Sequence, residues 1–265
     1  MTPILRCEQI TKHFGGLKVL EHIDLDVHAG EILALIGPNG AGKTTFFNVL
    51  TGYVRPTSGR VLFDGQDVTG APPDVIASLG MVRTFQATIM FDKMTVGQSM
   101  LTAHHLGGRG SVWSALFNRP SYRQREAAIE RASIELLEFM GLVDMKDELV
   151  ANLPHGRQRA LGVAMAMATR PRLLLLDEPV TGMNPEELVV LMRQIHDLRD
   201  LKQQTIVIIE HHMAAVMEFS DRITVLNFGR KIAEGTPAEI GTNPEVIEAY
   251  LSAPVASAAG DVPRA

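Results

Sequence analysis

Residues 37–45 read GPNGAGKTT, a stretch whose residue types and spacing suit phosphate binding. Glycines allow backbone N–H groups to approach phosphate oxygens where a Cβ would intrude. The apolar segment EILALI precedes the stretch and FFNVL follows it, so we expect a strand before it and a helix after it. A chance glycine-rich turn is the alternative, but it does not explain this order. The stretch therefore predicts a triphosphate site.

Each position of this loop has an expected contact. Lys43 is expected to reach the β- and γ-phosphates, and the Thr44 hydroxyl to ligate Mg²⁺. The residues predicted to contact the nucleotide are Gly37, Pro38, Asn39, Gly40, Ala41, Gly42, Lys43, Thr44 and Thr45.

Polar residues follow or end three other apolar runs. In LLLLDE, Asp177 is expected to hold Mg²⁺ through water, and Glu178 to orient or deprotonate the attacking water. Gln86 ends GMVRTFQ, where its amide can contact Mg²⁺ or that water, and His211 follows IVIIE, where an imidazole can hydrogen-bond the γ-phosphate. Read singly, these are ordinary strand-end residues. Their order after a phosphate loop favours catalytic roles for Lys43, Gln86, Glu178 and His211, and metal binding by Thr44, Gln86 and Asp177.

Residues 153–166 read LPHGRQRALGVAMA, which predicts a helix beginning near Pro154. A helix N-terminus with His155, Gly156 and Arg157 beside it is suited to bind an anion. A simple helix cap is the other interpretation.

Composition limits the classes of partner. The 265 residues carry 25 Lys and Arg against 30 Asp and Glu, a net charge of −5, which argues against nucleic acid as the main partner. The single cysteine rules out an intrachain disulfide. No apolar run approaches the roughly 20 residues that span a bilayer, and the N-terminal residues do not have the layout of a signal peptide. We expect any membrane role to be peripheral.

The alternation of apolar runs with helical segments predicts an α/β fold with a parallel sheet. Helices are expected over about 185–200 and 212–219, and another in FFNVLTGYVRP that stops near Pro56. We expect one domain over 1–252, with a core of about 1–87 and 159–252, a helical subdomain of about 88–158, and a flexible tail at 253–265.

Taken in order, these motifs resemble the ATP-binding cassette of ABC transporters, over roughly residues 4–252. FGGLKVL, RTFQ and SDRITVLNFGRKIAEGTPAEI are similar to the cytoplasmic ATPase of branched-chain amino-acid importers. The resemblance implies a P-loop NTPase with a RecA-like core, an antiparallel β-subdomain and a helical subdomain. It also implies ATP hydrolysis with ATP and Mg²⁺, Phe14 stacked on adenine, and a loop at Thr181 to Asn184 that follows the catalytic carboxylate.

The same resemblance implies partners and a location. These are an identical or paralogous ATPase subunit, two integral-membrane permeases, an extracytoplasmic binding protein reached indirectly, and no nucleic acid, at the cytoplasmic face of the inner membrane. A lipopolysaccharide-export ATPase and a urea or amide importer are the alternatives.

The family's LSGGQ segment, which binds the γ-phosphate of ATP held by the other subunit, corresponds here to residues 153–157, LPHGR. His155 and Gly156 are therefore expected to contact that ATP, whereas Pro154 removes a serine hydroxyl. A hydrogen bond to a charged group is worth about 1.5–3 kcal/mol. The N–H groups of the following residues remain, and the His155 imidazole or the Arg157 guanidinium can add charge, so the site is expected to be weakened or re-routed.

Overall fold

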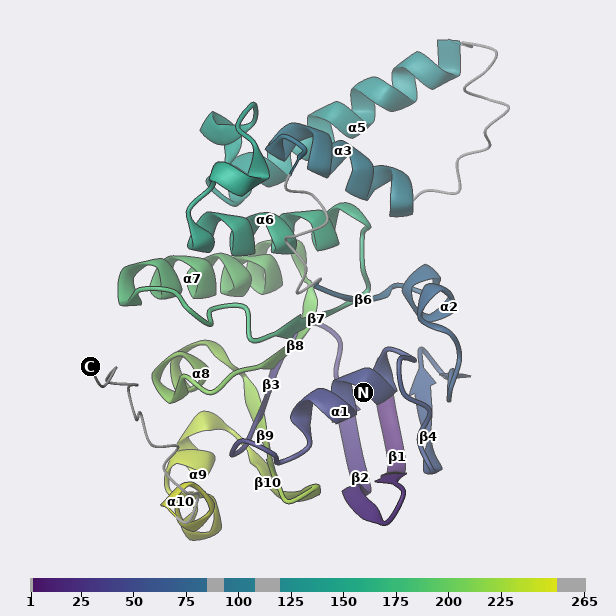
Figure 1. The fold of residues 1–265 in the computed structure, drawn as a ribbon, viewed down its shortest axis with the longest axis vertical. Coiled ribbons are helices and arrows are strands. Elements are labelled where there is room, and N and C mark those ends of the chain that lie inside the picture. Colours follow the sequence, from purple (N-terminus) through teal and green to yellow (C-terminus); the bar gives the residue numbers. More distant parts are fainter. Residues whose placement is uncertain (1, 85–92, 108–119, 252–265) are drawn as a thin grey trace, which may run out of the picture.

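The computed structural model describes residues 2–84, 93–107 and 120–251. Figure 1 shows β-sheets with covering helices at one end of the molecule and a group of helices at the other. The expected Gln86 and the tail 253–265 lie outside the described residues.

A largely parallel sheet forms the centre of the described structure. Its strand order is β10-β9-β3-β8-β7-β6, in which only β10 runs antiparallel to its neighbour. The strands are β3 (Ile32–Ile36), β6 (Met81–Arg83), β7 (Leu173–Asp177), β8 (Thr205–Ile209), β9 (Arg222–Asn227) and β10 (Arg230–Gly235). Every residue of β3, β7 and β8 is buried, as predicted from their continuous apolar runs.

A second sheet of the described region is antiparallel, with the order β2-β1-β4-β5. Its strands are β1 (Leu5–Phe14), β2 (Leu17–Val27), β4 (Ser58–Phe63) and β5 (Gln66–Asp67). Helix α1 (Lys43–Leu50) packs between the two sheets, because Phe46 and Phe47 are fully buried with residues from both. The helix thereby closes one face of the parallel sheet.

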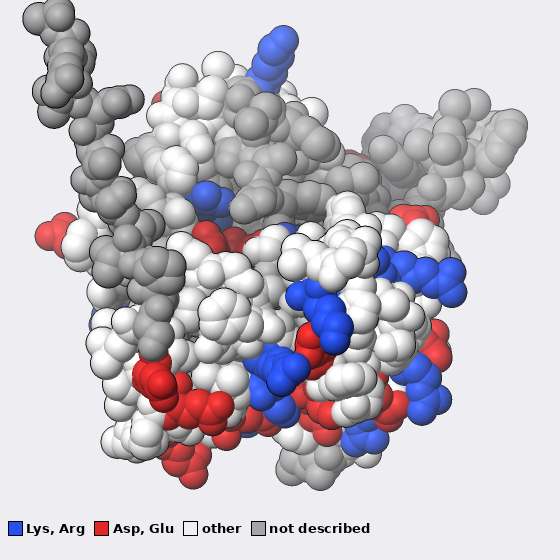
Figure 2. Space-filling model, turned by 60° about the horizontal axis from the view of Figure 1, so that its bottom comes forward, with Lys and Arg blue, Asp and Glu red and all other residues white. Residues whose placement is uncertain are grey.

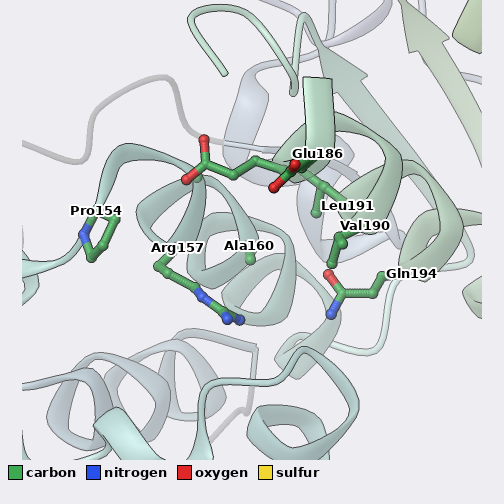
Figure 3. A pocket seen from close by; sticks show the side chains of 9 residues that line it. Pro154, Arg157, Ala160, Glu186, Val190, Leu191 and Gln194 are labelled. Atoms are coloured by element: carbon green, nitrogen blue, oxygen red, sulfur yellow. The ribbon is translucent and has the colours of Figure 1, made fainter. Parts of the chain in front are cut away.

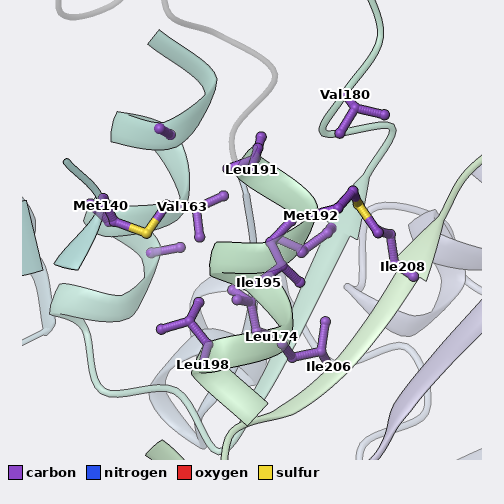
Figure 4. Packing of buried hydrophobic residues seen from close by; sticks show 14 of the residues in the cluster. Met140, Val163, Leu174, Val180, Leu191, Met192, Ile195, Leu198, Ile206 and Ile208 are labelled. Carbon is purple, nitrogen blue, oxygen red and sulfur yellow. The ribbon is translucent and has the colours of Figure 1, made fainter. Parts of the chain in front are cut away.

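The opposite face of the parallel sheet carries longer helices. In Figure 4, Leu174, Ile206 and Ile208 of the sheet lie against Met192 and Ile195 of α7 (Pro185–Lys202). The residues between these in each strand point to the other face of the sheet and pack toward α1. Because successive side chains of a strand point to opposite faces, the sheet separates a core on the α7 side from a core on the α1 side. Three short helices lie near the C-terminal side of the described chain: α8 (Met213–Phe219), α9 (Pro237–Gly241) and α10 (Pro244–Leu251).

Helices also form the end of the molecule farthest from the antiparallel sheet (Figure 1). They are α3 (Val96–Gly107), α5 (Pro120–Phe139), α6 (His155–Ala168) and the 3-10 turns Val143–Met145 and Val150–Asn152. Their buried side chains, such as Met100, Leu137 and Leu161, belong to the same core as α7. The described parts of residues 88–158, where a helical subdomain is predicted, are thus mostly helical.

Two elements near the phosphate loop differ from the predictions. Helix α1 ends at Leu50 rather than near Pro56, since Gly52 has φ 77° and a Cβ there would lie 2.2 Å from the Ala71 carbonyl oxygen. Because Gly52 and Ala71 are distant in the sequence, their close approach leaves no periodic pattern from which the end of the helix could be predicted. The short helix α2 (Pro73–Ser78) was not predicted, although Pro73 occupies its first turn.

Two leucines of α7 provide a matched test of this packing. Leu198 is fully buried in the core, whereas Leu201 is 71% exposed on the same helix. We expect Leu198→Ala to lower the free energy of unfolding by about 3 kcal/mol, because it leaves a cavity. Leu201→Ala should change it by less than about 0.5 kcal/mol. Urea unfolding measures both, and equal losses would show that α7 does not pack on the sheet as described.

Candidate nucleotide-binding site

The residues predicted to act together follow adjacent parallel strands. In the sheet register, Ile209 of β8 pairs with Leu35 of β3 on one side and with Asp177 of β7 on the other. The phosphate loop begins directly after β3, Glu178 directly follows β7, and His211 follows β8. Because carboxyl ends of parallel strands meet at one sheet edge, the three segments come together there.

The phosphate loop leads into α1 with a geometry that requires glycine at two positions. Gly37 has φ 150°, and a Cβ there would lie 2.1 Å from the Leu226 carbonyl oxygen. Gly42 precedes the helix at φ 100°, where a Cβ would lie 2.9 Å from the Val19 carbonyl oxygen. The Gly229 N–H also donates to the Ala41 carbonyl oxygen at 3.0 Å. The loop is thus packed against β2 and the β9–β10 turn.

The remaining residues of the loop differ in exposure. Lys43 is only 7% exposed, and its Nζ donates to the carbonyl oxygens of Gly37 at 2.7 Å and Pro38 at 3.1 Å. Burial lowers the pKa of Lys43, and the nearby carboxylates of Glu178 and Asp177 oppose that change. The exposed or half-buried members are Pro38, Asn39, Gly40, Thr44 and Thr45. A buried cation therefore lies beside hydroxyl and backbone groups that remain accessible.

Asp177 has a charged partner that sequence reasoning missed. One Nη of Arg83, in β6, forms an ion pair with the Asp177 carboxylate, and the other donates to Asn48 Oδ1 of α1 at 2.7 Å. The side chains of Arg83 and Asp177 are 17% and 4% exposed. The signal in the sequence was an arginine within the otherwise apolar run GMVRTFQ, whose strand is adjacent to β7.

Glu178 and His211 face each other across the sheet edge, as the prediction of shared chemistry required. His211 Nδ1 lies 3.9 Å from Glu178 Oε1, and Thr181 Oγ1 donates to Glu178 Oε2 at 3.2 Å. The backbone of Glu178 is left-handed, at φ 48°, and its N–H donates to the Ile209 carbonyl oxygen at 3.0 Å. Both side chains are partly exposed. They can therefore reach a molecule bound at the phosphate loop.

Phe14 ends β1 with 48% of its surface exposed. Lys12 Nζ lies 4.8 Å from the centroid of the Phe14 ring and also donates to the Arg55 carbonyl oxygen at 2.8 Å. The ring thus lies at the surface with a cation over it, a position from which an aromatic face can stack on a flat base. Gln86, predicted to lie with this group, is among the residues that the structure does not describe.

Helix α6 begins at His155, with Pro154 immediately before it. His155 is exposed, whereas Gly156 is buried, and a Cβ at Gly156 would lie 2.9 Å from the Glu187 carboxyl carbon of α7. The Arg157 guanidinium, one of the two groups predicted to be able to add charge at this helix end, has a backbone acceptor. Its Nη1 donates to the Gly141 carbonyl oxygen at 2.8 Å, after the end of α5.

A cavity of about 270 Å³ lies between α6 and α7, beside this helix end. In Figure 3, Pro154, Arg157 and Ala160 line its α6 side, and Glu186 and Gln194 come from α7. The sheet-edge residues do not line this cavity. It is therefore separate from the phosphate loop of the same chain.

On the face drawn in Figure 2, Lys and Arg side chains lie among Asp and Glu rather than in one basic patch. Within the described ranges, no helix has the length and apolar character needed to cross a membrane.

The family model described as "ABC transporter" matches residues 20–181, more than half of the chain. The chain belongs to the ABC transporter family. Within this family it is an ABC-type ATPase. A second model, described as "Branched-chain amino acid ATP-binding cassette transporter", matches residues 230–251 at the end of the cassette.

Relatives of known name match the cassette over nearly its full length. It is 44% identical over 250 residues to the high-affinity branched-chain amino acid transport ATP-binding protein LivG of Escherichia coli (strain K12), covering 94% of this chain and 98% of the relative. It is 41% identical over 249 residues to BraF of Pseudomonas aeruginosa, with the same coverage.

Solved structures show the same fold. The crystal structure of an ATP-binding cassette of an ABC transporter in its ADP conformation superposes with a TM-score of 0.83 at 31% identity, covering 95% of this cassette and all of that chain. The cassette therefore has the expected ABC ATPase fold, with the parallel core, antiparallel sheet and helical end described above.

The pair formed by Arg83 and Asp177 gives a test of the site's electrostatics. We expect Arg83→Met to lower the free energy of unfolding by about 3 kcal/mol, because a buried carboxylate loses its counter-charge. The matched control is Arg6→Met, which removes an exposed pair with Asp26 and should cost less than about 1 kcal/mol. Urea unfolding without nucleotide measures both. Similar losses would mean that the Arg83 pair is as weak as a surface pair.

Proposed function

We propose that this cassette is the ATP-hydrolysing subunit of a membrane transporter that imports branched-chain amino acids. The observation that carries the substrate class is the similarity to LivG over 94% of the chain, supported by the separate match at residues 230–251. The ATPase part rests on the phosphate loop, the carboxylates and the histidine gathered at one edge of the parallel sheet.

In this proposal the phosphate loop from Gly37 to Thr45 wraps the triphosphate, and Lys43 binds its β- and γ-phosphates. The close packing of Gly37 and Gly42 supports this assignment, because side chains there would clash with the strand backbone on which the loop rests. Lys43 exchanges its contacts with the Gly37 and Pro38 carbonyl oxygens for phosphate oxygens. Phe14 stacks on the adenine.

The oxygen donors at the sheet edge fit Mg²⁺, which prefers hard ligands and keeps several waters. Thr44 offers an accessible hydroxyl and Asp177 a carboxylate held in place by Arg83. Gln86, which lies outside the described residues, is proposed as a further oxygen ligand on its sequence position alone. Bound Mg²⁺ neutralises charge on the β- and γ-phosphates.

Glu178 orients the attacking water and accepts its proton, and His211 hydrogen-bonds the γ-phosphate. The separation of 3.9 Å between His211 Nδ1 and Glu178 Oε1 supports joint action on one phosphoryl group. Thr181 holds the second carboxylate oxygen, which limits the orientations of Glu178.

Two cassettes, identical or paralogous, pair so that His155 and Gly156 at the start of α6 contact the ATP of the partner. ATP stabilises the closed pair because it binds that state more tightly than the open one. In this arrangement the helical subdomain of about 88–158, attached to a core of about 1–87 and 159–252, presents that helix end.

The pair acts at the cytoplasmic face of the inner membrane, on two permease subunits supplied by an extracytoplasmic binding protein. Gln86 and the adjoining helical subdomain are the proposed receivers of the permeases.

Uptake of labelled leucine tests the proposal directly. In cells that express the cassette with its accompanying permeases, we expect Lys43→Ala to abolish both ATP binding by the purified chain and leucine uptake. Glu178→Gln should keep ATP binding and lose uptake, because only the hydrolytic step is removed. Lys231→Ala, on β10 away from the site, is the control and should keep both. Uptake that persists in the Lys43 variant would contradict the assignment.

Pro154 predicts a weakened contact with the partner's ATP. Pro154→Ser restores a hydroxyl at the start of α6, and a hydrogen bond to a charged group is worth about 1.5–3 kcal/mol. We expect ATP-driven pairing to tighten about tenfold, or ATPase turnover to rise, in the assembled complex. Pro72→Ser is the control, because Pro72 precedes α2 with a similar extended backbone. No change in either property at Pro154 would count against a signature contact there.

A further inference from the structure

Glu210 is a carboxylate that the catalytic assignments leave unused. It follows β8, lies one residue before His211, and is 0% exposed. Within the described residues no lysine or arginine forms an ion pair with it. A buried carboxylate without a cation is costly unless hydrogen bonds hold it.

Two backbone N–H groups from different loops donate to this carboxylate. Val180 N–H, in the loop after β7, donates to Glu210 Oε1 at 3.1 Å, and His211 N–H donates to Oε2 at 3.2 Å. Burial raises the pKa of Glu210, while these two donors and the nearby His211 and His212 favour its ionised form. Each carboxylate oxygen of Glu210 therefore accepts an N–H from one of the two loops.

The two loops are the ones that carry Glu178 and His211, the residues proposed to act together in ATP hydrolysis. Val180 is two residues after Glu178 and is fully buried, so its side chain packs in the core. A second bond, from Glu178 N–H to the Ile209 carbonyl oxygen at 3.0 Å, joins the same loops just beside it. The side chain of Glu210 thus completes a two-point connection between the segment of Glu178 and the segment of His211.

We propose that Glu210 is a positioning residue for ATP hydrolysis, which fixes the Glu178 loop and the His211 loop relative to each other by accepting one N–H from each. The inference rests on the ATPase activity of the cassette. A capping role for β8 alone needs only one acceptor, and a hydroxyl residue would supply it without burying a charge. The Val180 N–H bond is the one that crosses between the loops, because Glu210 is itself adjacent to His211 in the chain. The His211 N–H bond holds the other carboxylate oxygen against the backbone of its own loop.

Glu210→Gln tests this, because an amide keeps the size of the side chain but turns an N–H₂ group toward one of the two donors. We expect kcat for ATP hydrolysis by the full-length chain, purified with its accompanying subunits, to fall at least tenfold. A small misplacement of catalytic groups is sufficient for such a loss. The Kd for ATP, measured with a fluorescent ATP analogue, should stay within twofold, since within the described residues the two hydrogen bonds of the Glu210 carboxylate go to Val180 and His211 rather than to the phosphate loop.

Glu31→Gln is the matched control. Glu31 precedes β3 at the opposite edge of the sheet, where its carboxylate also accepts a backbone N–H, from His28 at 2.7 Å, and pairs with Arg222. The same chemical change there should leave kcat within twofold. Hydrogen exchange adds a local readout: residues 178–183 and 210–212 should exchange faster in Glu210→Gln and be unchanged in Glu31→Gln.

Should Glu210→Gln fail to fold, Glu210→Asp replaces it, because a shorter carboxylate keeps the charge but cannot span both donors, and the same split between kcat and Kd is expected. A folded variant at Glu210 with wild-type kcat, or one that loses ATP affinity in step with kcat, would overturn the proposal. A wild-type chain that fails to hydrolyse ATP would refute the ATPase assignment instead, so the two failures are distinguishable.

Discussion

Parallel pairing of β3, β8 and β7 is the constraint on which the site depends. Ile209 of the middle strand is in register with Leu35 and with Asp177, so the next residues of all three strands leave the sheet at the same level. Both faces of these strands are buried, which fixes the register, because a slip of one residue would exchange the two faces of each strand. The register of the sheet, rather than direct bonds among these residues, thereby brings the phosphate loop, the carboxylates and His211 together.

The phosphate loop is also supported on the side where it packs against two strands. Gly37 lies against the Leu226 carbonyl oxygen and Gly42 against that of Val19, so the loop rests on the backbone of two strands rather than on side chains. Gly229 of the β9–β10 turn completes this support through its bond to Ala41. Backbone contacts do not adopt other rotamers, and the N–H groups of the loop are consequently preorganised for an anion.

Much of the fold and part of the site could be predicted from the sequence, because their signals are local. Continuous apolar runs identified the central strands, and the glycine spacing identified the loop before Lys43. Arg83 and Glu210 were missed because their partners are distant in the chain: the Asp177 carboxylate and the Val180 N–H become neighbours only through sheet order. The bond from Arg157 to Gly141 was missed for the same reason, since it depends on how α5 and α6 pack.

The loop after β7 also has contacts in the direction of α6. A Cβ at Gly182 would lie 3.7 Å from Cε1 of His155, so the imidazole at the start of α6 rests on the loop that begins with Glu178. Gly156 lies still closer to Glu187, where a Cβ would be 2.9 Å from the carboxyl carbon, and that carboxylate accepts the Asn184 N–H in the capping box of α7. The helix end proposed to face the partner's ATP is therefore anchored to the same segment that carries the carboxylate acting on this chain's own ATP.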